Sequence, residues 1–73
     1  MEAEAALVEI TVNGQQRQIP SDQSVAAVLS WLELPSDRVA VELNRRIVRK
    51  PDWERTVVPA ASQIEVVEFV GGC

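Results

Sequence analysis

The fold is decided near the start of the chain by the stretch VEITVNG at residues 8–14. Its first five residues alternate apolar and polar side chains with a period of two, which is typical of a half-buried β-strand. Asn13-Gly14 follows, and this pair is the strongest short hairpin signal because both residues tolerate a positive φ. The chain returns through residues 15–19, which carry one apolar anchor, Ile19, before residues 20–22 end the segment. The stretch therefore predicts a two-stranded hairpin.

The one convincing helix follows this hairpin, at residues 24–34. Pro35 is expected to stop it, because the residue before a proline disfavours the helical conformation. Ser21, Asp22 and Ser24 are all suitable N-cap residues, and the pattern does not choose among them. Apolar residues recur at i, i+3, i+4 and i+7 and form one stripe, made of Val25, Val28, Leu29 and Leu32.

The two tryptophans are expected to differ in role. Trp31 lies about 120° from the centre of the helical stripe, so we expect it to flank the core and cover a loop, with ligand stacking as the alternative. Trp53 lies in PDWE at residues 51–54, which indicates a helical turn begun by proline. Trp53 is the expected anchor of that loop on the core.

The remaining signals are strands and a turn. VAVEL at residues 39–43 alternates, with its valines and leucine on one face. Residues 44–46 indicate a turn and residues 47–48 a short strand. IEVVEFV at residues 64–70 is rich in β-branched residues and predicts the last strand.

This order of elements can close a core only if the helix packs across one face of a mixed sheet. We therefore expect an α+β fold of the β-grasp (ubiquitin-like) class over residues 1–70, with a mixed four- to five-stranded sheet and one main helix across one face. Residues 71–73 are expected to be a flexible C-terminal diglycine tail with an extra Cys.

The composition excludes several kinds of chemistry. The 73 residues include no His and no Tyr, and the single Cys is the last residue. The nitrogen and sulfur ligands typical of zinc sites are therefore missing, and so is the base of Ser/His or Cys/His catalysis. The net charge of −4 argues against nucleic-acid binding, because phosphate contacts supply most of that affinity. We expect no catalytic residues, no metal site and no enzyme activity of the chain's own.

The sequence also indicates where the protein resides. No apolar run approaches the roughly 20 residues that a membrane span needs. Residues 1–6 hold two Glu and no Lys or Arg, unlike a signal or transit peptide. One Cys allows no internal disulfide. We therefore expect a cytoplasmic protein without a membrane segment.

Four features occur at a specific spacing in the second half of the chain: VELNRRIV at residues 41–48, Trp53, IEVV at residues 64–67, and Gly71-Gly72. With them the chain resembles the sulfur carriers of thiamine biosynthesis, the ThiS family, over nearly its whole length. It departs from the family pattern twice. Residues 60–62 (AAS) replace an Asp-rich turn, and Cys73 follows the diglycine.

The resemblance implies a sulfur-transfer cycle. An E1-like adenylyltransferase would use ATP to adenylate the carboxylate of Gly72, and a sulfur donor, either a cysteine desulfurase or a rhodanese-like protein, would convert it to a thiocarboxylate. Thiazole synthase would receive the sulfur and build the thiazole ring. The carrier itself would bind no cofactor, since the partner uses the ATP. Glycines suit such a tail because they lack a Cβ and allow close backbone approach in a narrow channel.

Cys73 leaves three interpretations open. A peptidase removes it to expose Gly72, it is an addition or the trace of a fusion, or its thiol takes part in the chemistry. An exposed terminal thiol without a role is the plain alternative.

Recognition by partners is expected beside the tail. In the last strand Ile64 and Val66 share one side, while Val67 and Phe69 share the other, and one of these pairs should face outward. That outward pair is either covered by Trp53 or the N-terminal strand, or forms an apolar docking patch. We expect partner contacts at Val67, Phe69, Val70, Arg45 and Arg46.

The basic cluster contains Arg45, Arg46, Arg49 and Lys50, and it is either a solvated turn or a charged contact for an acidic partner. Two other functions stay open. One is a sulfur carrier for molybdopterin, cysteine or a siderophore, and the other is a ubiquitin-like interaction module that transfers nothing.

Overall fold

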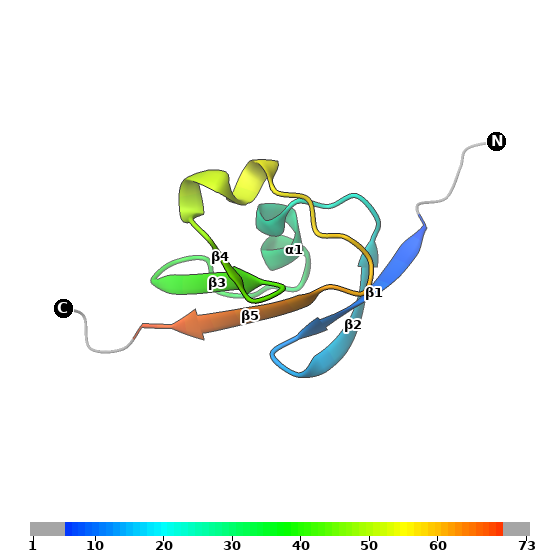
Figure 1. The fold of residues 1–73 in the computed structure, drawn as a ribbon, viewed down its shortest axis with the longest axis horizontal. Helices are drawn as coiled ribbons and strands as arrows, with labels where there is room; N and C mark the ends of the chain where they lie inside the picture. The colour runs from blue at the N-terminus through cyan, green and yellow to red at the C-terminus, as the bar shows by residue number, and fades with distance from the viewer. Residues whose placement is uncertain (1–5, 70–73) are drawn as a thin grey trace.

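A five-stranded mixed sheet forms the body of the protein, and one α-helix lies across one of its faces (Figure 1). The computed structural model describes residues 6–69. Along the chain the elements are β1 (Leu7–Val12), β2 (Gln15–Pro20), α1 (Val25–Trp31), β3 (Val39–Leu43), β4 (Arg46–Val48), the 3-10 helix η1 (Lys50–Arg55) and β5 (Gln63–Glu68).

The N-terminal hairpin forms as its sequence predicts. β1 and β2 pair antiparallel from Leu7 opposite Pro20 to Val12 opposite Gln15. Asn13 (φ 49°) and Gly14 (φ 83°) make the turn between them. Both φ values are positive, as a two-residue turn matched to the strand twist requires.

The last strand occupies the centre of the sheet, whose order is β2-β1-β5-β3-β4. β5 runs parallel to β1 and antiparallel to β3, and Figure 1 shows it between these two strands. β4 then completes a hairpin with β3. A mixed sheet with a single main helix on one face confirms the predicted β-grasp fold.

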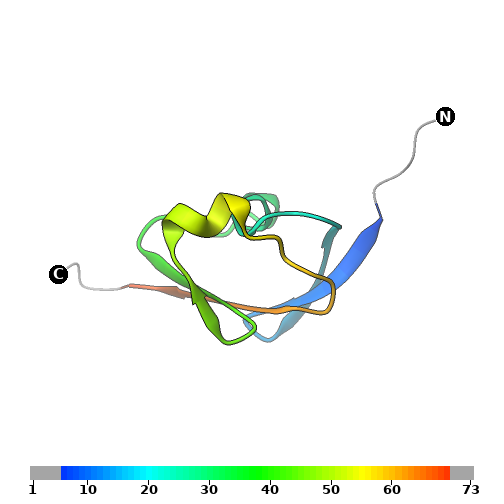
Figure 2. The ribbon, with the colours of Figure 1, turned by 45° about the horizontal axis from the view of Figure 1, so that its top comes forward.

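The core lies between this sheet and the layer formed by α1 and η1, which share one side of the sheet in Figure 2. Alternate residues of the strands point into it, so each strand buries one face and exposes the other. Burying an aliphatic side chain of this size contributes about 1.5–3 kcal/mol relative to exposure. The fully buried members are Ile10, Ile19, Val25, Val28, Leu29, Val41, Val58 and Ile64.

The helix begins where one of the three candidate caps predicts. Ser24 is the N-cap, and its Oγ accepts a 3.1 Å hydrogen bond from the backbone N–H of Ala27. This bond satisfies one of the donors that the first helical turn leaves free.

The predicted end of the helix is wrong by three residues, since α1 stops at Trp31 instead of residue 34. The N–H of Glu33 donates to the Ser30 carbonyl (3.1 Å), and the N–H of Leu34 donates to that of Leu29 (2.8 Å). These bonds form a Schellman motif, with Glu33 in the left-handed conformation at φ 57°. The Schellman motif therefore ends the helix before the chain reaches Pro35.

The two tryptophans differ strongly in solvent exposure. Trp53 in η1 is 5% exposed, and its Nε1 donates a 2.8 Å hydrogen bond to the Val48 carbonyl oxygen. It anchors its loop as predicted. Trp31 is 58% exposed and is not among the residues packed on the core, so the expectation that it flanks the core is wrong. Trp31 is the last residue of α1, and its position on the helix directs its side chain to solvent.

Within residues 6–69, no helix has the length and apolar character that crossing a membrane requires.

Candidate interaction surface on the open face of the sheet

The face of the sheet opposite α1 is open, and β5 directs apolar side chains onto it. Ile64 is buried and Val66 packs against the core, so these two residues form the inner pair. Val67 is 56% exposed and Phe69 is 59% exposed. The outer pair is therefore Val67 and Phe69, as one of the two alternatives in the sequence allowed.

Neither of the expected covers lies over this pair. Trp53 belongs to the core, on the other side of the sheet. The N-terminal strand β1 is hydrogen-bonded beside β5, within the same sheet. Among the described residues the interpretation that remains is an exposed apolar surface.

A third apolar side chain extends this surface across the sheet. Ile47 of β4 is 70% exposed and pairs with Glu42 of β3. Ala40, also on β3, pairs with Val67. We call Ile47, Val67 and Phe69 the open-face patch. Exposed apolar groups gathered on one face are a common mark of protein interaction sites.

Two carboxylates border the open-face patch. Glu42 and Glu65 occupy directly opposite positions on β3 and β5. Together with Arg45, Gln63 and Val67 they line a shallow cleft. Like charges placed opposite each other on neighbouring strands destabilise a sheet, so this pair costs some stability. The apolar patch thus has two negatively charged side chains at its border.

The basic cluster is divided by the short strand β4. Arg45 and Arg46 lie at the β3–β4 turn, whereas Arg49 and Lys50 follow the strand at its other end. All four side chains are exposed. Arg46 and Arg49 are three positions apart, which corresponds to about 10 Å along an extended strand. Only Arg45 lines the cleft beside the open-face patch.

Two asparagines bind β5 through their side chains, a role that sequence reasoning missed. The Asn13 amide bonds both backbone groups of Val66: Oδ1 accepts from the N–H (2.8 Å), and Nδ2 donates to the carbonyl oxygen (3.2 Å). Asn44 Oδ1 accepts from the N–H of Gln63 (2.9 Å), and its Nδ2 donates to Ser62 Oγ (3.3 Å). The sequence does show an asparagine in each of these two turns. It does not show which distant backbone groups the side-chain amides bind, because no local pattern records a partner far along the chain.

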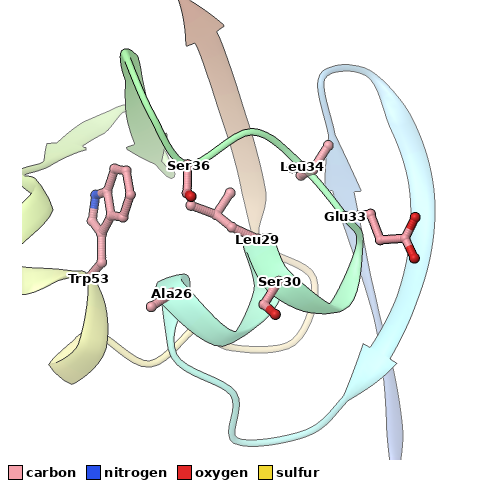
Figure 3. A pocket seen from close by; sticks show the side chains of 7 residues that line it. All are labelled: Ala26, Leu29, Ser30, Glu33, Leu34, Ser36 and Trp53. Carbon is pink, nitrogen blue, oxygen red and sulfur yellow. The ribbon is translucent and has the colours of Figure 1, made fainter.

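A second cleft lies on the helix side, between α1, η1 and the loop before β3. Figure 3 shows the Trp53 ring facing this space, while the Glu33 carboxylate points away from it. Its lining residues are Ala26, Leu29, Ser30, Glu33, Leu34, Ser36 and Trp53. Within residues 6–69, no three His, Cys, Asp or Glu side chains are grouped as a metal ion would require.

The predicted tail residues Gly71, Gly72 and Cys73 lie outside the described residues, as does Val70, a predicted contact residue. The last described backbone bond runs from the N–H of Phe69 to the carbonyl oxygen of Arg38 (2.7 Å). Two members of the open-face patch, Val67 and Phe69, thus shortly precede the diglycine in the sequence.

The family model for ThiS matches residues 6–72. This chain belongs to the ThiS family. The match confirms the resemblance drawn from the residues of the second half, and it extends to Gly72, one residue short of Cys73.

A solved ThiS structure has the same fold as this ThiS chain. The thiamine biosynthesis protein ThiS from Geobacter metallireducens superposes with a TM-score of 0.80 at 28% sequence identity. The superposition covers 90% of this chain and all of that one.

Relatives of two sizes match the ThiS chain. A thiazole synthase from Paramagnetospirillum magneticum is 34% identical over 65 residues, which cover 89% of this chain and 20% of that protein. The chain therefore spans about a fifth of the length of that relative. A protein named ycf40 from Pyropia yezoensis is 31% identical over 65 residues, with 89% of this chain and 92% of that protein covered.

Proposed function

We propose that this protein is a sulfur carrier of thiamine biosynthesis that holds sulfur as a thiocarboxylate on Gly72. The observation that carries the proposal is the ThiS family match, which spans the β-grasp body and ends on the second glycine. The body is the recognition element, and the reactive group is the carboxyl carbon of Gly72. The protein is a cosubstrate of other enzymes.

The chemistry follows from the inertness of a carboxylate. An oxygen of the Gly72 carboxylate attacks the α-phosphorus of ATP in an E1-like adenylyltransferase, and pyrophosphate leaves. The terminal sulfur of a persulfide on a cysteine desulfurase or a rhodanese-like donor then attacks the acyl carbon. The C–O bond to AMP breaks, AMP leaves with the electron pair, and an acyl disulfide to the donor cysteine forms. A thiol attacks the donor-cysteine sulfur of this disulfide, so the S–S bond breaks: the thiol and the donor cysteine are oxidised to a disulfide, and the thiocarboxylate leaves with the electron pair.

The open-face patch is the proposed docking surface for the adenylyltransferase. Fixing flexible backbone costs about 1–2 kcal/mol per residue, so binding of the body must offset the cost of ordering a glycine tail. Val67 on β5 and Phe69, which directly follows β5, are well placed for this, because both are exposed and shortly precede the tail in the sequence. Arg45 adds one cation at the edge of the patch.

Thiazole synthase is the proposed receiver of the sulfur. Two relatives named thiazole synthase, from Paramagnetospirillum magneticum and Magnetococcus marinus, contain a segment like this chain within a much longer protein. A carrier and its acceptor joined in one polypeptide act at a high effective concentration. This arrangement supports thiazole synthase over an acceptor for molybdopterin, cysteine or a siderophore.

Cys73 has to be absent at the moment of activation. Hydrolysis of the Gly72–Cys73 bond by a peptidase frees the Gly72 carboxylate, which is where the family match ends. With Cys73 in place the activated carbon would lie one residue too far along the chain.

The test compares a chain ending at Gly72 with the full 73-residue chain and with a chain ending at Val70. Each is incubated with adenylyltransferase, ATP and a sulfur donor, and then followed by pyrophosphate exchange and intact mass. We expect AMP transfer and replacement of one oxygen by sulfur only in the chain that ends at Gly72. Thiazole formation on adding thiazole synthase identifies the acceptor.

Two results would contradict the proposal. One is the absence of AMP transfer to the chain ending at Gly72. The other is full retention of partner binding and biological role by the chain ending at Val70, which indicates an interaction module that transfers nothing. Sulfur found on a chain that still carries Cys73 overturns the peptidase step alone.

A further inference from the structure

The pairing between β1 and β5 stops early, which leaves the end of β5 with a single strand neighbour. The parallel register contains only Thr11 opposite Gln63 and Val12 opposite Ile64. The last main-chain bond between them runs from the N–H of Asn13 to the Ile64 carbonyl oxygen (2.9 Å). At Asn13 and Gly14 the chain turns away into β2.

The strand β5 continues past that point with β3 on its other side, where pairing extends to Val39 opposite Glu68. Alternate residues of a strand direct their N–H and carbonyl groups toward opposite neighbours. Ile64 and Val66 therefore share the side toward β1. After β1 has turned away, no main-chain partner on that side is found for Val66 within residues 6–69.

The side chain of Asn13 supplies the missing partner. Its amide carries one acceptor and one donor group, the same pair that a strand residue presents. Both are used on Val66, at 2.8 Å from the N–H and 3.2 Å to the carbonyl oxygen. Asn13 thus adds one more rung to the parallel ladder after the backbone of β1 has left it.

We infer that Asn13 is a positioning residue for carrier activation, because it holds the end of β5 in the sheet and so fixes the placement of Val67 and Phe69 in the open-face patch. This inference rests on the proposed function. Val67 is adjacent to Val66, and Phe69 lies three residues beyond it. A partner has to bind both the patch and the tail. These two parts keep one position relative to each other only while the end of β5 stays hydrogen-bonded in the sheet.

Loss of the Asn13 amide should weaken binding of the carrier to the adenylyltransferase, whereas the rate of the chemical step should change little. A released strand end has to be ordered each time the partner binds, so the cost falls on binding, whereas the bound complex reacts as before. We expect KM for the carrier in pyrophosphate exchange to rise about 3- to 10-fold with kcat unchanged.

The turn geometry allows the side chain to be tested separately from the backbone. Asn13 has φ 49°, and glycine adopts such values without strain. Asn13→Gly therefore removes the amide and keeps the turn. Asn13→Asp also suits the turn and keeps an acceptor for the Val66 N–H, but it has no donor for the carbonyl oxygen.

Asn44→Gly is the matched control. Asn44 also has a positive φ, at 52°, and its amide also accepts from a β5 N–H, that of Gln63. This contact lies at the start of β5, four residues before Val67. The control therefore loses a similar clamp without releasing the end of the strand.

The experiment uses chains ending at Gly72, at a temperature where denaturation curves show each variant folded. Hydrogen exchange of the Val66 amide and the kinetics of pyrophosphate exchange are both measured. In Asn13→Gly the Val66 amide should exchange at least about 10-fold faster and KM should rise, because the bond that protects the amide is gone. In Asn13→Asp protection should be largely kept, whereas Asn44→Gly should leave KM unchanged.

The inference is overturned if Asn13→Gly leaves Val66 as protected as before, if its KM stays at the unmodified value, or if Asn44→Gly raises KM equally. Failure of the proposed function has a different signature. In that case the unmodified chain ending at Gly72 receives no AMP, and hydrogen exchange alone decides whether Asn13 holds the strand end.

Discussion

The indole Nε1 of Trp53 donates a 2.8 Å hydrogen bond to the backbone carbonyl oxygen of Val48. This bond joins η1 to the end of β4, five residues earlier in the chain. The same side chain is 5% exposed and belongs to the core. Trp53 therefore fastens the connection between β4 and β5 through both packing and polar contact.

Trp53→Phe should lower the free energy of unfolding by about 1–3 kcal/mol, because it leaves the Val48 carbonyl without its partner and reduces the buried volume. Trp53→Ala should cost about 3–5 kcal/mol through the cavity it creates. Urea denaturation followed by circular dichroism measures both changes. Trp31→Phe is the control, and it should stay within about 0.5 kcal/mol since Trp31 is exposed.

Glu33→Gly should stabilise the protein by about 0.5–1 kcal/mol. Glu33 follows the C-cap of α1 in the left-handed conformation at φ 57°, where a side chain is unfavourable and glycine is the usual residue. Thermal denaturation should show a higher Tm. Ser30→Gly, which places glycine inside the same helix, should lower the Tm, and a fall in both variants would refute the assigned helix end.

Phe69→Ala should weaken binding to the adenylyltransferase about 10-fold or more, because exposed aromatic side chains at the centre of an interface dominate affinity. Its fold should be unchanged, since Phe69 contributes little to the core. Titration calorimetry with chains ending at Gly72 measures the dissociation constant. Leu7→Ala is the control at an equally exposed apolar residue on β1, outside the open-face patch. Equal loss in the two variants would argue against docking at the patch.

Glu65→Gln should raise the free energy of unfolding by about 0.2–1 kcal/mol. Glu65 lies directly opposite Glu42 in the antiparallel pairing of β3 and β5, so neutralising it removes a like-charge contact. The gain should shrink in high salt, because screening already weakens repulsion between exposed charges. Urea curves at low and high ionic strength test this. An unchanged or lower stability at low salt would contradict it.

The sequence by itself determined the elements that depend on neighbouring residues. Asn13-Gly14 predicts its turn because both residues tolerate positive φ, alternation predicts β1 and β3, and β-branched residues predict most of β5. Pro51 marks the start of η1 for a similarly local reason, its fixed φ. The order of these elements was enough to predict the β-grasp fold.

Only the tertiary structure decided what depends on residues far apart in the chain. α1 covers one face of β5, and this leaves Val67 and Phe69 on the other. The Asn13 amide reaches Val66, 53 residues away, through contacts that no local pattern encodes. The end of α1 at Trp31 also escaped prediction, since Glu33, a non-glycine residue, took the left-handed position that closes the helix. Backbone preferences act over a few residues, whereas packing and long-range hydrogen bonds exist only once the sheet has formed.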